Sequence, residues 1–173
     1  RSAHARRHNM ALLDSGTLYV ARFTGNSPEE EIDGSGELPS DGAFDGTGEW
    51  IPLASGNRSF VPGMSADEVY VFTREAADRV GATKMDRPED IEPNPVNGRV
   101  YCALTNNSQR GTDGHAGPDE VNPRRVNKHG QVLEIDDDPT GREFRWNLLL
   151  VCGDPEDPST YFGGFDKSQV SPI

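Results

Sequence analysis

Residues 83–107 read TKMDRPEDIEPNPVNGRVYCALTNN and place an arginine and three acids directly in front of an apolar, strand-like run. Pro88 fixes its own φ and disfavours helical geometry for the residue before it, so this approach is predicted to be extended. The Asn97-Gly98 pair is a strong signal for a tight hairpin turn. Residues 100–104 then alternate in the manner of a half-buried strand. The stretch therefore predicts two strands joined by a short turn.

An acidic approach, a short strand, a turn and a second strand are typical of the inner strands of a propeller blade. The start of the innermost strand faces the central channel, so Arg87 and Glu89 would lie at the mouth of that channel. A carboxylate there can hold a hard cation, and a guanidinium can bind anionic oxygens through paired hydrogen bonds. The alternative is a surface Arg–Glu pair in front of a strand, which is common and contributes little stability.

Local patterns predict several further elements. A capping box formed by Ser65 and Glu68 precedes an apolar pattern of helical spacing that ends at Gly81. Residues 1–9 lack any period and are expected to fray. Further strands are expected at residues 17–23, 49–53, 131–135 and 144–152.

Two long polar segments are predicted to be loop insertions. Residues 24–48 are rich in glycine and acids and are expected to be solvated, and residues 108–129 show no apolar period. The fold class that follows is mainly β, with one helical excursion and long loops. With the blade pattern above, it corresponds to part of a β-propeller, about two blades of it.

Several short runs along the chain carry a family resemblance. They resemble the PhoX-type alkaline phosphatases, a secreted bacterial family, and they occur in the same order: LLDSGTLYVARF, GEWIPL, MDRPED, NGRVYCALTNN, NPRRVNKHGQVLEI and FRWNLLLVCGD. The resemblance implies a β-propeller with a cluster of iron and calcium at the channel mouth. It also implies hydrolysis of small phosphate monoesters and a periplasmic or extracellular location.

The resemblance assigns roles to a few residues. On the matching RPE motif, Glu89 looks like a metal-binding carboxylate and Arg87 like the catalytic arginine that binds the substrate phosphate. Asp90 stands where the family often has a large apolar residue, so no role is carried over to it. Asn127 matches an asparagine before the next strand and is interpreted as a support residue.

Composition favours a piece of a larger fold. Only 33% of the residues are apolar, with Gly 19 and Pro 13, which is a small supply of core for a free-standing globule. Residues 1–173 are therefore expected to be an internal fragment of a single β-propeller phosphatase domain, whose other metal ligands lie elsewhere. Such a piece is expected to be inactive alone, and its open strand edges could pair with another copy.

Charge and cysteine usage exclude other classes. The net charge of −12, with 29 acids against 17 bases, argues against nucleic-acid binding. There is no run approaching the ~20 apolar residues of a membrane span. Cys102 and Cys152 lie in apolar runs and are predicted to be buried free thiols, because no zinc or disulfide pattern accompanies them.

Other candidate ligands are weaker. The acids and glycines of residues 41–49 do not match a calcium-loop spacing, and Asp136 to Asp138 are typical of a solvated hairpin tip. His115 and His129 each lack a partner at a metal-ligand spacing. Besides the phosphatase, two alternatives stay open: a non-catalytic binding propeller in which Arg87 and Glu89 pair with each other, and a calcium-dependent propeller lactonase or esterase.

Overall fold

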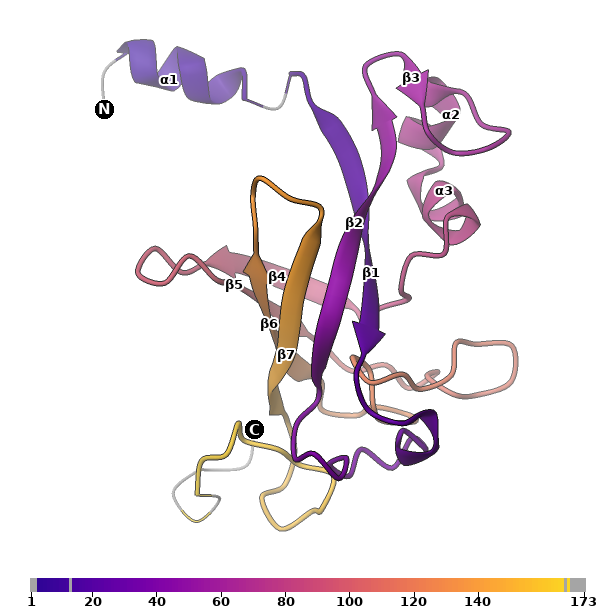
Figure 1. The fold of residues 1–173 in the computed structure, drawn as a ribbon, viewed down its shortest axis with the longest axis vertical. Helices are drawn as coiled ribbons and strands as arrows, with labels where there is room; N and C mark the ends of the chain where they lie inside the picture. The colour runs from indigo at the N-terminus through magenta and orange to yellow at the C-terminus, as the bar shows by residue number, and fades with distance from the viewer. Residues whose placement is uncertain (1–2, 13, 167, 169–173) are drawn as a thin grey trace. The chain divides into compact units, whose positions relative to one another are not determined.

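A computed structural model describes residues 3–12, 14–166 and 168 of the chain (Figure 1). The chain divides into two compact units: Arg1–Arg22 with Trp50–Ala82, and Phe23–Glu49 with Thr83–Ile173. The elements in chain order are α1 (Ala3–Met10), β1 (Thr17–Gly25), η1 (Glu29–Glu31), β2 (Asp45–Ser55), β3 (Arg58–Ser59), α2 (Ala66–Val71), α3 (Thr73–Arg79), β4 (Pro88–Pro93), β5 (Val100–Leu104), β6 (Gln131–Asp137) and β7 (Glu143–Val151).

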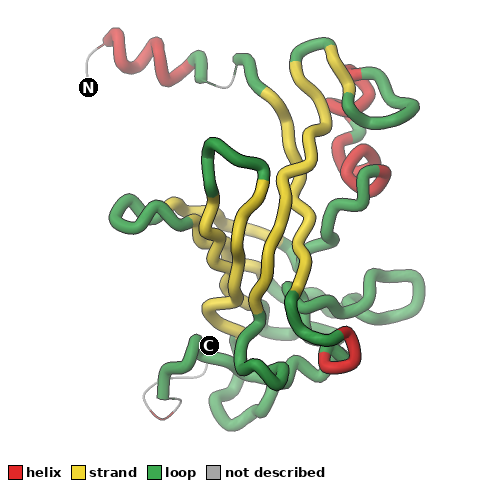
Figure 2. The backbone as a smooth tube through the Cα atoms, in the orientation of Figure 1, coloured by secondary structure: helices red, strands yellow, loops and turns green. Residues whose placement is uncertain are grey.

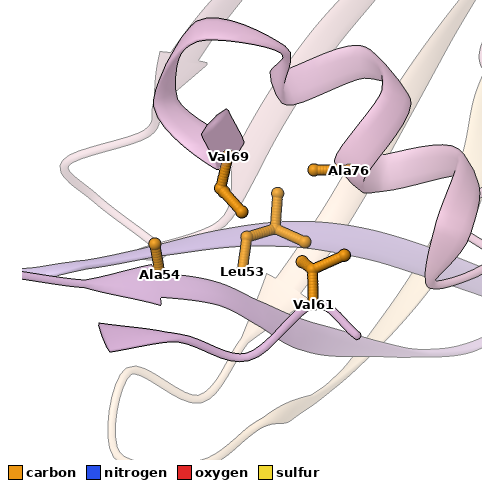
Figure 3. Packing of buried hydrophobic residues seen from close by; sticks show 5 residues of the cluster. All are labelled: Leu53, Ala54, Val61, Val69 and Ala76. Carbon is orange, nitrogen blue, oxygen red and sulfur yellow. The ribbon is translucent and has the colours of Figure 1, made fainter. Parts of the chain in front are cut away.

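The smaller unit packs two short helices on β2 and β3. Its core contains Leu53, Ala54, Val61, Val69 and Ala76, each at most 3% exposed (Figure 3). Leu18, Val20, Met64 and Val80 pack against this cluster. The helices bury their apolar side chains against the strands on one face. Removal of this apolar surface from water is the main contribution to the stability of such a unit.

The capping box is confirmed at the start of α2. The Ser65 hydroxyl accepts from Glu68 N, and the Glu68 carboxylate accepts from Ser65 N at 2.7 Å. The single helix predicted to run on to Gly81 is wrong, however, because Phe72 (φ −111°, ψ 47°) leaves helical geometry and separates α2 from α3. Thr73 follows at once, and its hydroxyl donates to Val69 O at 2.9 Å, a local side-chain bond that often bends helices.

The helix at the start of the chain was not predicted, because residues 1–9 show no apolar period. Residues 3–10 form α1, which ends on Arg7 and His8, basic residues that suit the negative end of the helix dipole. Arg1 and Ser2 lie outside the described residues.

The larger unit is built on an antiparallel sheet. From residues 45–49 of β2 the sheet continues through β7, β6 and β5 to β4 (Figures 1 and 2). Alternation explains β7, in which Phe144, Trp146 and Leu148 are buried while Glu143 and Arg145 face solvent. The aromatic residues are fixed further: the Phe23 ring lies edge-on to Phe144 at 5.1 Å, and Trp146 Nε1 donates to Thr47 O at 2.9 Å.

Strand β4 is exposed along its whole length and lies at the edge of this sheet. That placement explains why prolines are tolerated at both of its ends, Pro88 and Pro93. The two strands predicted from residues 83–107 are confirmed, but the two-residue turn between them is not. Only Gly98 of the Asn97-Gly98 pair has positive φ (75°), and Asn94 N bonds to Arg99 O at 2.8 Å, so the connection spans residues 94–99.

The two predicted loops are loops, but they are less solvated than expected. The first is shortened by β1 and β2 and contains η1, and its Phe44 is only 1% exposed. The second contributes a set of buried polar side chains: Arg110, Glu120, Asn122, Arg124 and Asn127. Glu120 joins the loops, because its carboxylate accepts from Ser27 N at 2.9 Å and from Asp45 N at 3.1 Å. Polar contacts therefore order segments that have almost no apolar core.

Candidate functional site

The structure brings Arg87 and Glu89 together at the start of β4. Arg87 Nη2 lies 3.2 Å from Glu89 Oε1, and Arg87 Nη1 donates to Asn106 Oδ1 at 2.9 Å. The Thr105 hydroxyl also donates to Glu89 Oε1, at 3.3 Å. Both charged side chains are about half exposed, at 58% and 50%. The arginine and the carboxylate therefore present their charges to solvent side by side, held by residues that follow β5.

The backbone of Arg87 has an unusual conformation. Its φ is +45°, whereas the sequence predicted extended geometry in front of Pro88, so that prediction is wrong at this residue. A non-glycine residue in this region, directly before proline, is strained by about 1–3 kcal/mol and persists only where its surroundings hold it. Arg87 N donates to Met85 O at 3.0 Å, and Arg87 O accepts from Thr105 N at 3.1 Å. The strained backbone aims the guanidinium towards Asn106 and Glu89.

Directly before Arg87, the Asp86 side chain is fully buried. Its Oδ1 accepts from Arg110 Nε and from Asn107 Nδ2, each at 2.8 Å, and its Oδ2 accepts from Asn127 Nδ2 at 3.1 Å. Arg110 is 1% exposed, so this is a buried, charge-assisted ion pair. Nothing in the local sequence distinguishes Asp86 from the acids beside it, so its burial could not be predicted from the sequence.

Asn127, predicted as a support residue, lies in the same buried network. Besides Asp86, its amide donates to Gln131 Oε1 at 2.8 Å, and its side-chain oxygen accepts from Arg124 Nη2 at 2.7 Å. It is 1% exposed and does not contact Arg87 directly. Through Gln131 and Asp86 it links β6 to the segment that precedes Arg87.

The electrostatics of this network depend on burial. Burial raises the pKa of Asp119 above its ordinary value, against the opposite effects of a hydrogen bond from Asn122 and the charge of Arg110. Asp119 Oδ2 lies 3.8 Å from Arg110 Nη1. The Arg110 guanidinium therefore has a fully buried acid on one side and a partly exposed acid on the other.

Hollows of about 670 and about 590 Å³ lie in the larger unit, and neither of these is lined by Arg87 or Glu89. The first is lined by Glu49, by Asp136 to Asp138 and by Glu143, among others. The hairpin tip predicted at Asp136 to Asp138 is wrong for its first two residues, because Asp136 and Asp137 belong to β6 and pair with β7.

The described residues supply only part of a metal site. No group of at least three His, Cys, Asp or Glu side chains within them could hold a metal ion. His115 bonds locally to Thr112 and to Asp113 O, as a surface histidine does. Glu89 fits the role of one ligand, because both of its hydrogen bonds fall on Oε1 and leave Oε2 for a cation. Calcium takes about six to eight oxygens, so further ligands are required.

The chain thus has a mainly β fold, with an arginine and a carboxylate exposed together at a strand end. The model of the family described as alkaline phosphatase PhoX matches residues 1–173, and the chain belongs to that family. No curated protein matches. None of the helices in the described part of the chain is long and apolar enough to cross a membrane.

Among solved structures, the chain resembles the PhoX of Pseudomonas fluorescens, solved in complex with vanadate, a transition-state analogue. The two are 38% identical with a TM-score of 0.70, over 99% of this chain and 28% of that chain. The likeness confirms the predicted fold class, a mainly β chain that forms part of a β-propeller. The predicted burial of Cys102 and Cys152 as free thiols is confirmed as well.

Proposed function

We propose that this chain is the phosphate-binding part of a metal-dependent alkaline phosphatase that hydrolyses small phosphate monoesters. The observation that carries the proposal is the Arg87 guanidinium, held beside Glu89 on a strained backbone in a member of the PhoX family. We also propose that the chain is an internal piece of a single β-propeller phosphatase domain, in a protein that acts in the periplasm or outside the cell. It spans 28% of the P. fluorescens PhoX chain, which supports this arrangement.

Arg87 has the donors that a phosphoryl group needs. One N–H of Nη1 is given to Asn106 and one of Nη2 to Glu89, and its remaining N–H groups can point at anionic oxygens. A guanidinium fixed in this way stabilises negative charge that develops on the phosphoryl oxygens without having to reorganise. Arg87 is thus the catalytic and substrate-binding residue of the proposal.

Glu89 serves both the arginine and the metal. Its Oε1 keeps the Arg87 guanidinium in place, while Oε2 is available to a cation. Iron and calcium, the metals we propose, would polarise the phosphoryl oxygens as Lewis acids when bound. Asn127 supports the site through its hydrogen bond to the Asp86 carboxylate.

The test uses full-length protein and p-nitrophenyl phosphate. We expect Arg87→Ala and Glu89→Gln each to remove most activity, and Glu89→Gln to lower the bound iron and calcium measured by elemental analysis. The matched control is the exposed Glu75–Arg79 ion pair, 2.5 Å between Oε1 and Nη2, which lies on α3. Arg79→Ala and Glu75→Gln should keep near-normal turnover. Near-normal turnover in Arg87→Ala or Glu89→Gln would refute the roles proposed here.

One observation favours a second candidate function. Arg87 and Glu89 already pair with each other at 3.2 Å, as they would in a propeller that binds or supports without chemistry. Full-length protein that contains no iron or calcium and is inactive on p-nitrophenyl phosphate would establish that candidate. Esterase activity without phosphatase activity would instead indicate the calcium-dependent hydrolase.

A further inference from the structure

We propose that the buried Asp86–Arg110 ion pair positions Arg87 for phosphate binding, and that Asp86 and Arg110 are positioning residues of the site. The inference rests on the proposed function, since it requires Arg87 to bind phosphate. It adds residues that do not touch substrate: Asp86 is fully buried and Arg110 is 1% exposed. They act on Arg87 through the backbone and through Asn106.

The first route is along the chain into Arg87. Arg110 donates to the backbone of Lys84 through Nη2 and to the Asp86 carboxylate through Nε. Asp86 N donates to Asn122 Oδ1 at 2.9 Å. These contacts fix the backbone just before Arg87, whose φ of +45° needs such support.

The second route reaches the Arg87 side chain through two residues that follow β5, Asn106 and Asn107. The Asp86 oxygen that pairs with Arg110 also accepts from Asn107 Nδ2 at 2.8 Å. Asn107 N in turn donates to Asn127 O at 2.7 Å. Asn107 is adjacent to Asn106, whose side chain receives Arg87 Nη1. One buried carboxylate therefore precedes the residue that carries the guanidinium and bonds to the neighbour of the residue that orients it.

A purely stabilising role explains this arrangement less well. A buried ion pair adds little net stability over apolar residues of the same size, because both charges must leave water. Such a pair instead fixes the orientation of the side chains that take part in it, because charge-assisted hydrogen bonds are directional. The Asp86 carboxylate accepts from Arg110, Asn107 and Asn127, and these contacts converge next to the strained residue. A guanidinium whose orientation is fixed in advance binds phosphate oxygens with a smaller loss of conformational entropy.

The test is a double-mutant cycle between Asp86 and Arg87 in the full-length protein. The probe is inorganic phosphate, its dissociation constant measured by calorimetry, with KM and kcat for p-nitrophenyl phosphate alongside. Asp86→Asn keeps the shape of the side chain but replaces one accepting oxygen by an NH2 group, which faces the N–H donors of Arg110, Asn107 or Asn127. Because contacts that position Arg87 are then lost, we expect phosphate to bind about tenfold more weakly. In the Arg87→Ala background the same change should alter phosphate binding by less than about twofold, because the residue it positions is gone.

Two further variants keep the test decisive. Asn107→Ala removes one donor to Asp86, together with the acceptor of Gln109 N, and leaves the Asp86–Arg110 pair. It therefore tests the second route if Asp86→Asn does not fold. We expect it to weaken phosphate binding in the same direction. Glu120→Gln is the control: it alters a carboxylate that is only 5% exposed and that bonds to Ser27 and Asp45, away from Arg87. It should lower the unfolding midpoint and leave phosphate affinity unchanged.

The outcomes separate this inference from the proposed function. If Arg87→Ala weakens phosphate binding while Asp86→Asn and Asn107→Ala do not, positioning is overturned and the function stands. Equal losses from Asp86→Asn with and without Arg87 would also overturn it, because they would show a general structural effect. If Arg87→Ala itself leaves phosphate binding unchanged, the proposed role of Arg87 falls, and the positioning inference falls with it.

Discussion

Replacing Gly130 by alanine should damage the site far more than the same change at Gly98. Both glycines have positive φ, 78° and 75°, so both substitutions strain the backbone alike. Their surroundings differ. A Cβ on Gly130 would lie 2.2 Å from Leu104 O, whereas a Cβ on Gly98 would meet nothing within 4 Å. The pair of variants therefore separates a steric clash from conformational strain.

The magnitude follows from what the clash displaces. Left-handed geometry costs alanine about 1–2 kcal/mol, and part of this is offset because alanine also restricts the unfolded chain. At Gly98 the net loss should be about 1 kcal/mol. Relief of the clash at Gly130 requires a shift of about 1 Å to reach an ordinary C···O contact. That shift would break hydrogen bonds of Gly130 with Asn127 (3.1 Å), Cys152 (3.0 Å) and Arg124 (2.8 Å). At about 1 kcal/mol each, the total becomes about 4 kcal/mol.

Urea unfolding, followed by circular dichroism and tryptophan fluorescence, measures both free energies. Gly130→Ala should shift the midpoint strongly at an unchanged slope, and Gly98→Ala should shift it slightly. Because Gly130 N bonds to Asn127, the first variant should also weaken phosphate binding. Equal destabilisation by the two substitutions would refute the reasoning, since it would show that the contact with Leu104 O does not constrain the turn.

The remaining predictions concern stability, pH dependence and thiol reactivity. Leu53→Ala should destabilise the smaller unit by about 2–5 kcal/mol in thermal unfolding, because Leu53 is fully buried, while Leu53→Met should cost under about 1.5 kcal/mol. Hydrogen bonds from Ser65 hold the pKa of Glu68 below its usual 4.5, so its stabilisation is present above that pH and is lost as pH falls through the lowered pKa. Glu68→Gln should flatten this acid-side fall in the unfolding midpoint, and an unchanged profile would count against it. Burial raises the pKa of Cys102 and Cys152, so both thiols should react with a disulfide reagent only on unfolding; fast labelling of native protein would contradict this.

Sequence reasoning succeeded where the cause is local. The capping box needs only Ser65 and Glu68, three residues apart, and it is present. The alternation of residues 100–104 predicts a strand with Cys102 and Leu104 inside, and both are buried. Arg87 and Glu89 flank Pro88 in the sequence, and their side chains meet at the start of β4.

It failed at two places. The helix predicted to run on to Gly81 breaks at Phe72, which is 55% exposed although it fits the apolar spacing. Apolar spacing does not show that the Thr73 hydroxyl bonds to Val69 O at this point. Arg87 adopts positive φ against the preference of a residue before proline. A local rule cannot predict this, because the hydrogen bonds that hold it come from other segments.

The sequence by itself determined that this chain is mainly β and which strand ends carry charge, because side-chain alternation, turn chemistry and capping act over a few residues. The phosphate and metal roles proposed for Arg87 and Glu89 come from the family resemblance of the motif that contains them. Only the tertiary structure decided that Asp86 is buried and paired with Arg110, 24 residues further on, while the adjacent Arg87 is exposed. Whether a carboxylate ends in water or in a buried network depends on which segments the fold brings together, and that is a property of the whole chain.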